Sequence, residues 1–129
     1  MTYTTEKNVI EAYLNANFTG VRLAYENDEM TDVSVNEWIR VSIQNADAFQ
    51  ASLGSNPLFR YLGILYFQIF TRPDIGSGRA IEIADMLSAL FRAVKVSGIT
   101  FKTPKLQKLG VRNGWYQVNL STAFSREDS

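Results

Sequence analysis

Apolar and polar residues alternate along the C-terminal part of the chain in the manner of β-strands. Residues 115–120 read WYQVNL, in which every second residue from the tyrosine onward is apolar. Successive side chains of a strand point to opposite faces, so this segment predicts a strand with one apolar and one largely polar face. The preceding dipeptide Asn113-Gly114 favours a tight turn because both residues tolerate positive φ, and it predicts a hairpin with residues 105–111.

Two other segments repeat their apolar residues at three- and four-residue steps, which is the spacing of amphipathic helices. The first predicted helix runs from Glu6 to about Asn17, with Thr4 or Thr5 as its N-cap, and Ser77 is the expected N-cap of the second. The apolar positions are Ile10, Tyr13, Leu14 and Phe18 in the first helix, and Ala80, Ile83, Ala84, Leu87, Leu90, Phe91 and Val94 in the second.

Further strands are predicted at residues 21–25, 38–44, 59–71 and 99–103, whereas residues 45–57, which include Gly54 and Pro57, are expected to form a loop. The resulting order is αβββαβββ with hairpin-like connections. It predicts an α+β fold, in which a mostly antiparallel sheet has two main helices packed on it. We expect one domain over residues 1–129, ending in a flexible tail at residues 125–129.

The segment from Phe59 to Thr71 is rich in aromatic and β-branched residues and is apolar on nearly both strand faces. The second helix covers one face, and too little chain remains to cover the other. The second face is therefore expected to meet further protein, most simply a neighbouring subunit. The residues predicted at a subunit or partner interface are Tyr61, Tyr66, Phe67, Gln68, Trp115, Tyr116, Lys105, Lys108 and Arg112.

Composition excludes several kinds of chemistry. The 129 residues include 13 basic and 13 acidic side chains but no histidine and no cysteine. A net charge of zero provides no overall field for nucleic acid or membranes, and the missing residue types remove the commonest general base, thiol nucleophile and zinc ligands. We expect no enzyme activity, no cofactor and no metal site. The N-terminus does not read as a signal peptide, and no segment is long and apolar enough to span a membrane, so an intracellular protein is the default.

Three polar clusters permit a ligand, but each has a simpler interpretation. Glu26, Asp28, Glu29 and Asp32 could attract a hard cation, yet they lack the spacing of a calcium loop and are expected to form a solvated acidic loop. The Gly76-Ser77-Gly78 stretch could hold a phosphate but lacks a longer glycine fingerprint. The basic residues Lys102, Lys105, Lys108 and Arg112 are expected in a solvated loop, or in a loop ordered by a charged partner.

The sequence also resembles a known family along almost its whole length. The resemblance rests on the N-terminal helix, on VRLAYEN at residues 21–27, on EWIRV at 37–41, on a glycine-containing turn before the helix at 79–91, and on GWYQVNL at 114–120 followed by Phe124. In these features the chain resembles the small tail terminator proteins of long-tailed bacteriophages, including lambda-like phages and related prophages.

This resemblance implies a structural virion protein, assembled in the host cytoplasm, that forms a ring, commonly a hexamer. The ring would cap the head-proximal end of the tail tube, stop tube polymerisation and dock onto the neck of the head. The implied partners are the protein itself, the tail tube protein and a head completion or neck protein. DNA would only pass through the lumen, without specific binding. Loops that rearrange on assembly would correspond to residues 46–57 and 103–114.

Two alternatives remain open at the level of sequence. Another phage neck protein, such as a head–tail connector or a tail completion factor, would have a similar size and α+β build and would differ in its partners. A small-molecule-binding α+β domain or enzyme would instead require a concave pocket with perturbed ionisable groups.

Overall fold

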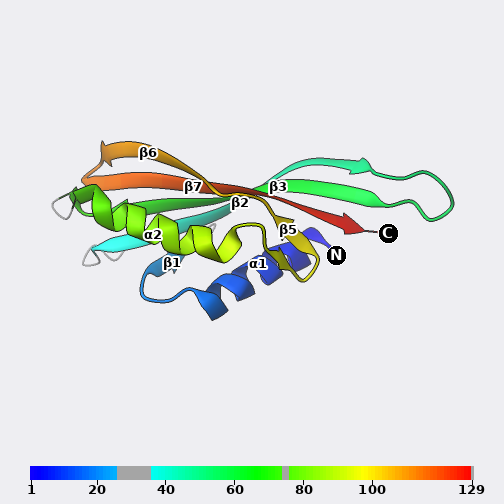
Figure 1. The fold of residues 1–129 in the computed structure, drawn as a ribbon, viewed down its shortest axis with the longest axis horizontal. Helices are drawn as coiled ribbons and strands as arrows, with labels where there is room; N and C mark the ends of the chain where they lie inside the picture. Colours follow the sequence, from blue (N-terminus) through cyan, green and yellow to red (C-terminus); the bar gives the residue numbers. More distant parts are fainter. Residues whose placement is uncertain (26–35, 74–75, 129) are drawn as a thin grey trace.

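The computed structural model describes residues 1–25, 36–73 and 76–128. Helices α1 (Tyr3–Asn17) and α2 (Gly76–Phe91) lie on the same side of one curved sheet (Figure 1). The strands are β1 (Arg22–Ala24), β2 (Glu37–Gln50), β3 (Phe59–Thr71), β4 (Lys95–Val96), β5 (Ile99–Phe101), β6 (Lys105–Arg112) and β7 (Trp115–Asp128). The α+β class and the predicted element order are confirmed, with β4 as a short addition.

Strand β3 is the central strand of the sheet, as its apolar sequence predicts. It pairs antiparallel with β2 on one side and with β7 on the other, and the order across the sheet is β1-β2-β3-β7-β5-β4, with β6 also paired to β7. Only β1 runs parallel to its neighbour β2. The predicted β6–β7 hairpin is confirmed, since Arg112 pairs with Trp115 across Asn113 and Gly114, whose φ values are 52° and 80°.

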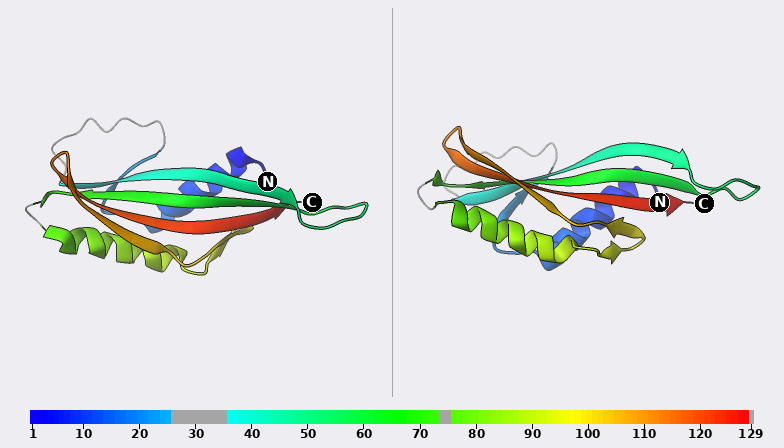
Figure 2. Two further views of the ribbon diagram at one scale, coloured as in Figure 1. Left: turned by 90° about the horizontal axis from the view of Figure 1, so that it is seen from above. Right: turned by 45° about the horizontal axis from the view of Figure 1, so that its top comes forward.

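We call the side of the sheet that faces α1 and α2 the inner face, and the opposite side the outer face (Figure 2). The inner face forms the hydrophobic core. Leu65, Phe67 and Ile69 of β3 have no exposed surface and pack with α1, α2 and β7. At Gly63 the ring of Phe124 takes the space of a side chain, because an added Cβ would lie 2.9 Å from its Cε1 and Cε2 atoms.

Both helices begin earlier than predicted. Helix α1 starts at Tyr3, and its N-cap is Thr2, whose hydroxyl accepts a hydrogen bond of 3.1 Å from the Thr5 amide. Thr4 and Thr5 therefore lie within the first turn. Helix α2 starts at Gly76, so Ser77 is inside the helix and does not precede it as a cap.

Two segments predicted to be irregular are strands, and a cluster expected in a loop lies on a strand. Strand β2 continues through the expected loop to Gln50, with a register irregularity between Asn45 and Ala48. The basic residues Lys105, Lys108 and Arg112 lie on β6, which is the strand predicted at residues 105–111. The expected tail at residues 125–128 continues β7, where the ladders to β3 and β5 fix it in place. In each case backbone pairing with a neighbouring strand outweighs the weak strand preference of polar residues.

Candidate interaction surfaces

The far ends of β2 and β3 form a projecting arm, residues 46–62. The loop at its tip extends beyond both chain termini (Figure 1). Residues 48–59 contain no charged side chain, although charged residues make up 20% of the chain. Four large apolar side chains of this stretch are exposed, namely Phe49, Leu53, Leu58 and Phe59, and Leu53 is 93% exposed. Exposed apolar side chains of this kind make the arm a candidate surface for another macromolecule.

Hydrogen bonds within the arm hold its loop in shape. The Ala51 amide donates to the Leu58 carbonyl at 2.6 Å, and the Leu58 amide donates to the Ser52 hydroxyl at 2.8 Å. Arg60 forms an ion pair with Glu127 of β7 and lies 5.9 Å from the centre of the Phe49 ring. The apolar tip is thus displayed by a structured hairpin.

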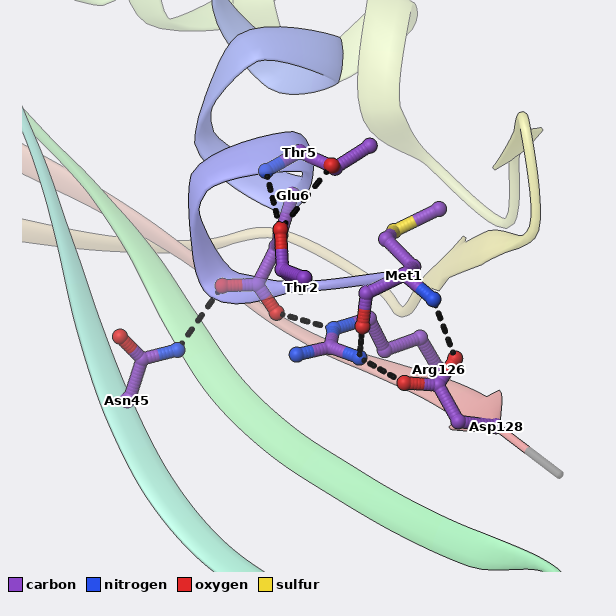
Figure 3. Close-up of polar contacts among 7 residues, drawn as sticks. All are labelled: Met1, Thr2, Thr5, Glu6, Asn45, Arg126 and Asp128. Atoms are coloured by element: carbon purple, nitrogen blue, oxygen red, sulfur yellow. Dashed lines mark hydrogen bonds and ion pairs between the residues drawn. The ribbon is translucent and has the colours of Figure 1, made fainter.

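A buried polar cluster, which we call the clasp, ties α1 to the end of β7 at the base of the arm (Figure 3). Arg126 Nε donates to Glu6 Oε1 at 2.8 Å, and both side chains are 2% exposed. Asn45 Nδ2 donates to the other Glu6 oxygen at 2.9 Å. Arg126 Nη1 donates to the Met1 carbonyl and to Asp128, and Asp128 also pairs with the N-terminal ammonium.

The acidic partners of Arg126 favour its charged form. Burial alone would lower the pKa of Arg126, but the hydrogen bonds and charges of Glu6 and Asp128 together outweigh this effect and raise it. The rings of Tyr61 and Tyr3 flank the guanidinium, with centres 4.2 and 5.2 Å from its central carbon. Sequence reasoning missed the clasp because Glu6 and Arg126 lie 120 residues apart and no local pattern marks either.

A cleft of about 260 Å³ lies beside the clasp, between α1 and the free edge of β2. Its only buried charged residue, Glu6, already pairs with Arg126, and Lys7 pairs with Glu11 at 3.0 Å. The charged side chains that line the cleft are therefore already engaged in ion pairs. Its lining residues are Tyr3, Thr4, Glu6, Lys7, Ile10, Glu11, Tyr25, Val41, Ser42, Ile43 and Asn45.

None of the described helices covers the outer face of the sheet (Figure 2). At one end of this face, Trp38 stacks on Phe70 with ring centres 4.3 Å apart and meets Trp115 edge-on at 6.3 Å. The guanidinium of Arg72 lies 3.9 Å from the centre of the Trp115 ring, and that of Arg40 lies 5.5 Å from the Trp38 ring. Cation–π contacts of this kind hold arginine side chains against a surface.

Polar residues flank the β3 row along the rest of the outer face. Tyr66 lies between Ser42 and Ser121, while Gln68 has Arg40 and Asn119 as its neighbours. Cross-strand partners share a face, so side chains of β6 also belong to this surface. Gln107 lies opposite Asn119, Lys105 opposite Ser121, and Arg112 opposite Trp115.

The structure separates the nine predicted interface residues into two groups. Tyr66, Gln68, Trp115, Lys105 and Arg112 share the outer face. The other four lie on the inner side. Phe67 is completely buried in the core, Tyr116 packs against the core, Tyr61 contacts the clasp, and Lys108 is exposed opposite Val118. Phe67 thus belongs to the core and contributes nothing to a surface.

The sequence matches a protein family described as "Phage tail terminator protein" over residues 6–121. The chain belongs to this family of tail terminators. It is therefore a structural component of a phage tail, as the resemblance indicated. No curated protein matches the sequence. One solved structure, whose title names no function, shares the fold with a TM-score of 0.74 at 16% identity, over 100% of this chain and 98% of that one.

Of the other candidate sites in the sequence, one lies outside the described residues and one is part of a helix. The acidic stretch at residues 26–32 lies outside the described residues. Gly76-Ser77-Gly78 forms the first turn of α2. Within the described ranges, no group of three or more acidic, histidine or cysteine side chains could hold a metal ion. Neither described helix has the length and apolar content needed to cross a bilayer.

Proposed function

We propose that copies of this protein assemble into a ring, with six subunits as the expected number, that caps the head-proximal end of the tail tube. The ring stops tube polymerisation and offers the neck of the head a docking surface. The observation that carries this proposal is the family match over residues 6–121. The tail tube protein and a head completion or neck protein are the partners in this proposal.

The arm supports assembly because it is built as a contact surface. It projects from the body, lacks charge over residues 48–59 and exposes four large apolar side chains. Contacts between two different surfaces of neighbouring subunits generate rings when the rotation closes. We assign the arm as the apolar half of such a contact.

The two long sides of the sheet support the same arrangement. Within the described residues, the edge of β2 that points away from β3 has no strand partner beyond Arg40, and β6 pairs only with β7. These free edges lie on opposite sides of the sheet, which is where the next and the previous subunit of a ring would sit. Both edges contain register irregularities, at residues 45–48 and 108–110, which limit indiscriminate pairing.

The test combines assembly and capping. We would measure native mass across protein concentration, image the same sample by negative stain, and then add the protein to polymerising tail tube subunits. We expect open rings and tubes of limited length. If tubes grow to the same lengths with and without the protein, the capping function is wrong. Binding to a portal-side complex in place of tube ends would indicate a head–tail connector.

A matched pair of variants tests the role of the arm. Leu53→Asp places a charge at the arm tip, whereas Met86→Asp places the same charge on the exposed side of α2, where Met86 is 41% exposed. Both should stay folded, because both side chains are exposed. Only Leu53→Asp should prevent ring formation or capping. Equal loss in both variants would show that the arm has no special role.

A further inference from the structure

We propose that the outer face of the sheet contacts the phosphate backbone of double-stranded DNA without reading its sequence. This inference rests on the proposed ring and adds that the outer face lines its passage for DNA. It goes further by assigning the contact to one face and to named cations.

The charge distribution of the two faces differs. Ladder partners place Arg22, Arg40, Lys105 and Arg112 on the outer face, and Arg72 lies there over Trp115. Among the described residues, the only carboxylate at a paired strand position of this face is Glu127, which is already bound to Arg60. Of the other described acidic residues, Asp47 lies in the β2 irregularity, and the rest lie on the helices or the inner side, namely Glu6, Glu11, Glu37, Glu82, Asp85 and Asp128. In the part of the chain that the structure describes, a polyanion thus meets these cations without acidic neighbours on the same face.

Four of these cations are available for a partner. Arg22, Arg40, Lys105 and Arg112 are exposed, and no described carboxylate lies within ion-pair distance of any of them. Arg40 lies beside the Trp38 ring, 5.5 Å from its centre. A guanidinium held against an aromatic ring keeps N–H groups at its edge, which suit phosphate oxygens.

The other polar side chains of the face fit the same ligand. Gln68, Asn119 and Gln107 form a row of amides across β3, β7 and β6, and Ser42 and Ser121 add hydroxyls. Amide, hydroxyl and cationic groups are the usual partners of DNA phosphates, which position a duplex without specifying its sequence.

A protein partner fits the outer face less well. Protein interfaces have an apolar centre surrounded by a polar rim. Beyond the aromatic cluster at Trp38, the apolar row of β3 is narrow, because Ser42 and Gln44 border it on β2, and Asn119 and Ser121 border it on β7. Contacts limited to phosphates are also weak, with a Kd of about 10⁻⁴ to 10⁻⁶ M for non-specific binding. Weak contacts of this kind let DNA move along the face.

The test measures duplex binding by the full chain. A labelled duplex of mixed sequence is titrated from about 50 to about 200 mM salt, and the slope of log K against log salt is recorded. The test variant is Arg40→Gln with Arg112→Gln. The matched control is Arg92→Gln with Lys95→Gln, two exposed cations at the end of α2 and in β4 that also lack a described ion pair. Thermal melting of each variant checks the fold.

We expect the wild type and the control to bind with the same salt slope, and the slope of the test variant to fall by about 2, which is about 1 per phosphate contact. No salt-dependent binding by the wild type, or an equal decrease in the control, would overturn the proposal. It would also be overturned if the test variant lost only self-association or tube capping, since the face would then be a protein interface.

Failure of this inference can be distinguished from failure of the proposed function. A protein that caps tubes but does not bind duplex through Arg40 and Arg112 leaves the ring in place and removes the DNA contact. A protein that binds duplex through these residues but never caps tubes leaves the contact in place and removes the ring.

Discussion

Strand β3 passes through two regions of the molecule in which phenylalanine side chains differ in their exposure to solvent. In the body, the Phe67 ring is completely buried between the sheet and α2. In the arm, Phe59 of the same strand is 37% exposed. Both segments are apolar in sequence, and both pair with β2 and β7. The difference comes from the helices, which cover the inner face only over the body.

This comparison shows that burial depends on the layer above a strand as well as on the strand itself. An apolar strand beneath a helix stabilises the monomer, whereas the same composition without that cover is left for a partner. Gly63 marks the boundary between the two regions, since Phe124 of β7 folds over it from the inner side.

The largest expected effect comes from truncating matched residues in the two regions. Phe67→Ala should lower the free energy of unfolding by about 3–5 kcal/mol, because it leaves a cavity in the core. Phe59→Ala should change it by less than about 1 kcal/mol, since the ring is already partly in water. Chemical denaturation of both variants measures the difference. Equal losses would mean that the arm is part of the cooperative core.

Disruption of the clasp should lower the free energy of unfolding by nearly as much. Glu6→Ala leaves the buried Arg126 without its main partner, and breaking a buried pair in this way should cost about 3–5 kcal/mol of unfolding free energy. Glu6→Leu combined with Arg126→Met removes both charges and should cost less. If the double replacement lowers the free energy of unfolding as much as Glu6→Ala does, the packing of these side chains matters more than their charges.

The boundary itself should show an intermediate effect. Gly63→Ala would place a methyl group against the Phe124 ring and should cost about 1–3 kcal/mol through overpacking. Adding Phe124→Leu should restore part of the loss, because it removes the ring. If a double-mutant cycle shows no recovery of stability, contact with the Phe124 ring is not the cause of the loss in Gly63→Ala.

The smallest effect concerns the ion pair between α2 and β2 and depends on pH. A hydrogen bond from Arg79 lowers the pKa of Glu37, against the opposing effect of partial burial. The folded carboxyl therefore titrates below its unfolded value of about 4.3, and its contribution is present above that pH and is lost as the pH falls through the folded value. Because Arg79 is partly exposed, the contribution should stay within about 1 kcal/mol. Glu37→Gln should flatten the acid side of the stability profile, and an unchanged profile would contradict this assignment.

Sequence periodicity predicted those elements whose own residues decide their structure. The stripes of α1 and α2, the apolar run of β3 and the Asn113-Gly114 turn are of this kind. Residues 45–50 were predicted wrongly because half of them are polar and their strand conformation depends on pairing with residues 59–63. Family membership was also readable from the sequence, as the match over residues 6–121 confirms.

The surfaces were only partly readable. Alternation placed Tyr66 and Phe67 on opposite faces, but it did not show which face the helices cover. The cations Lys105 and Arg112 were noticed as a local cluster, whereas Arg40 joins them only across the sheet, through the row from β2 to β6. Residues that are brought together only by the pairing of distant strands share no pattern in the local sequence.

The ion pair between Glu6 and Arg126 also has a consequence for the order of events during synthesis. Helix α1 emerges first from the ribosome, but the guanidinium that neutralises its buried carboxylate follows 120 residues later. Until β7 has been translated, closing α1 over the sheet would bury an unpaired charge, which is strongly unfavourable. The body therefore closes late, once the last strand of the sheet is in place.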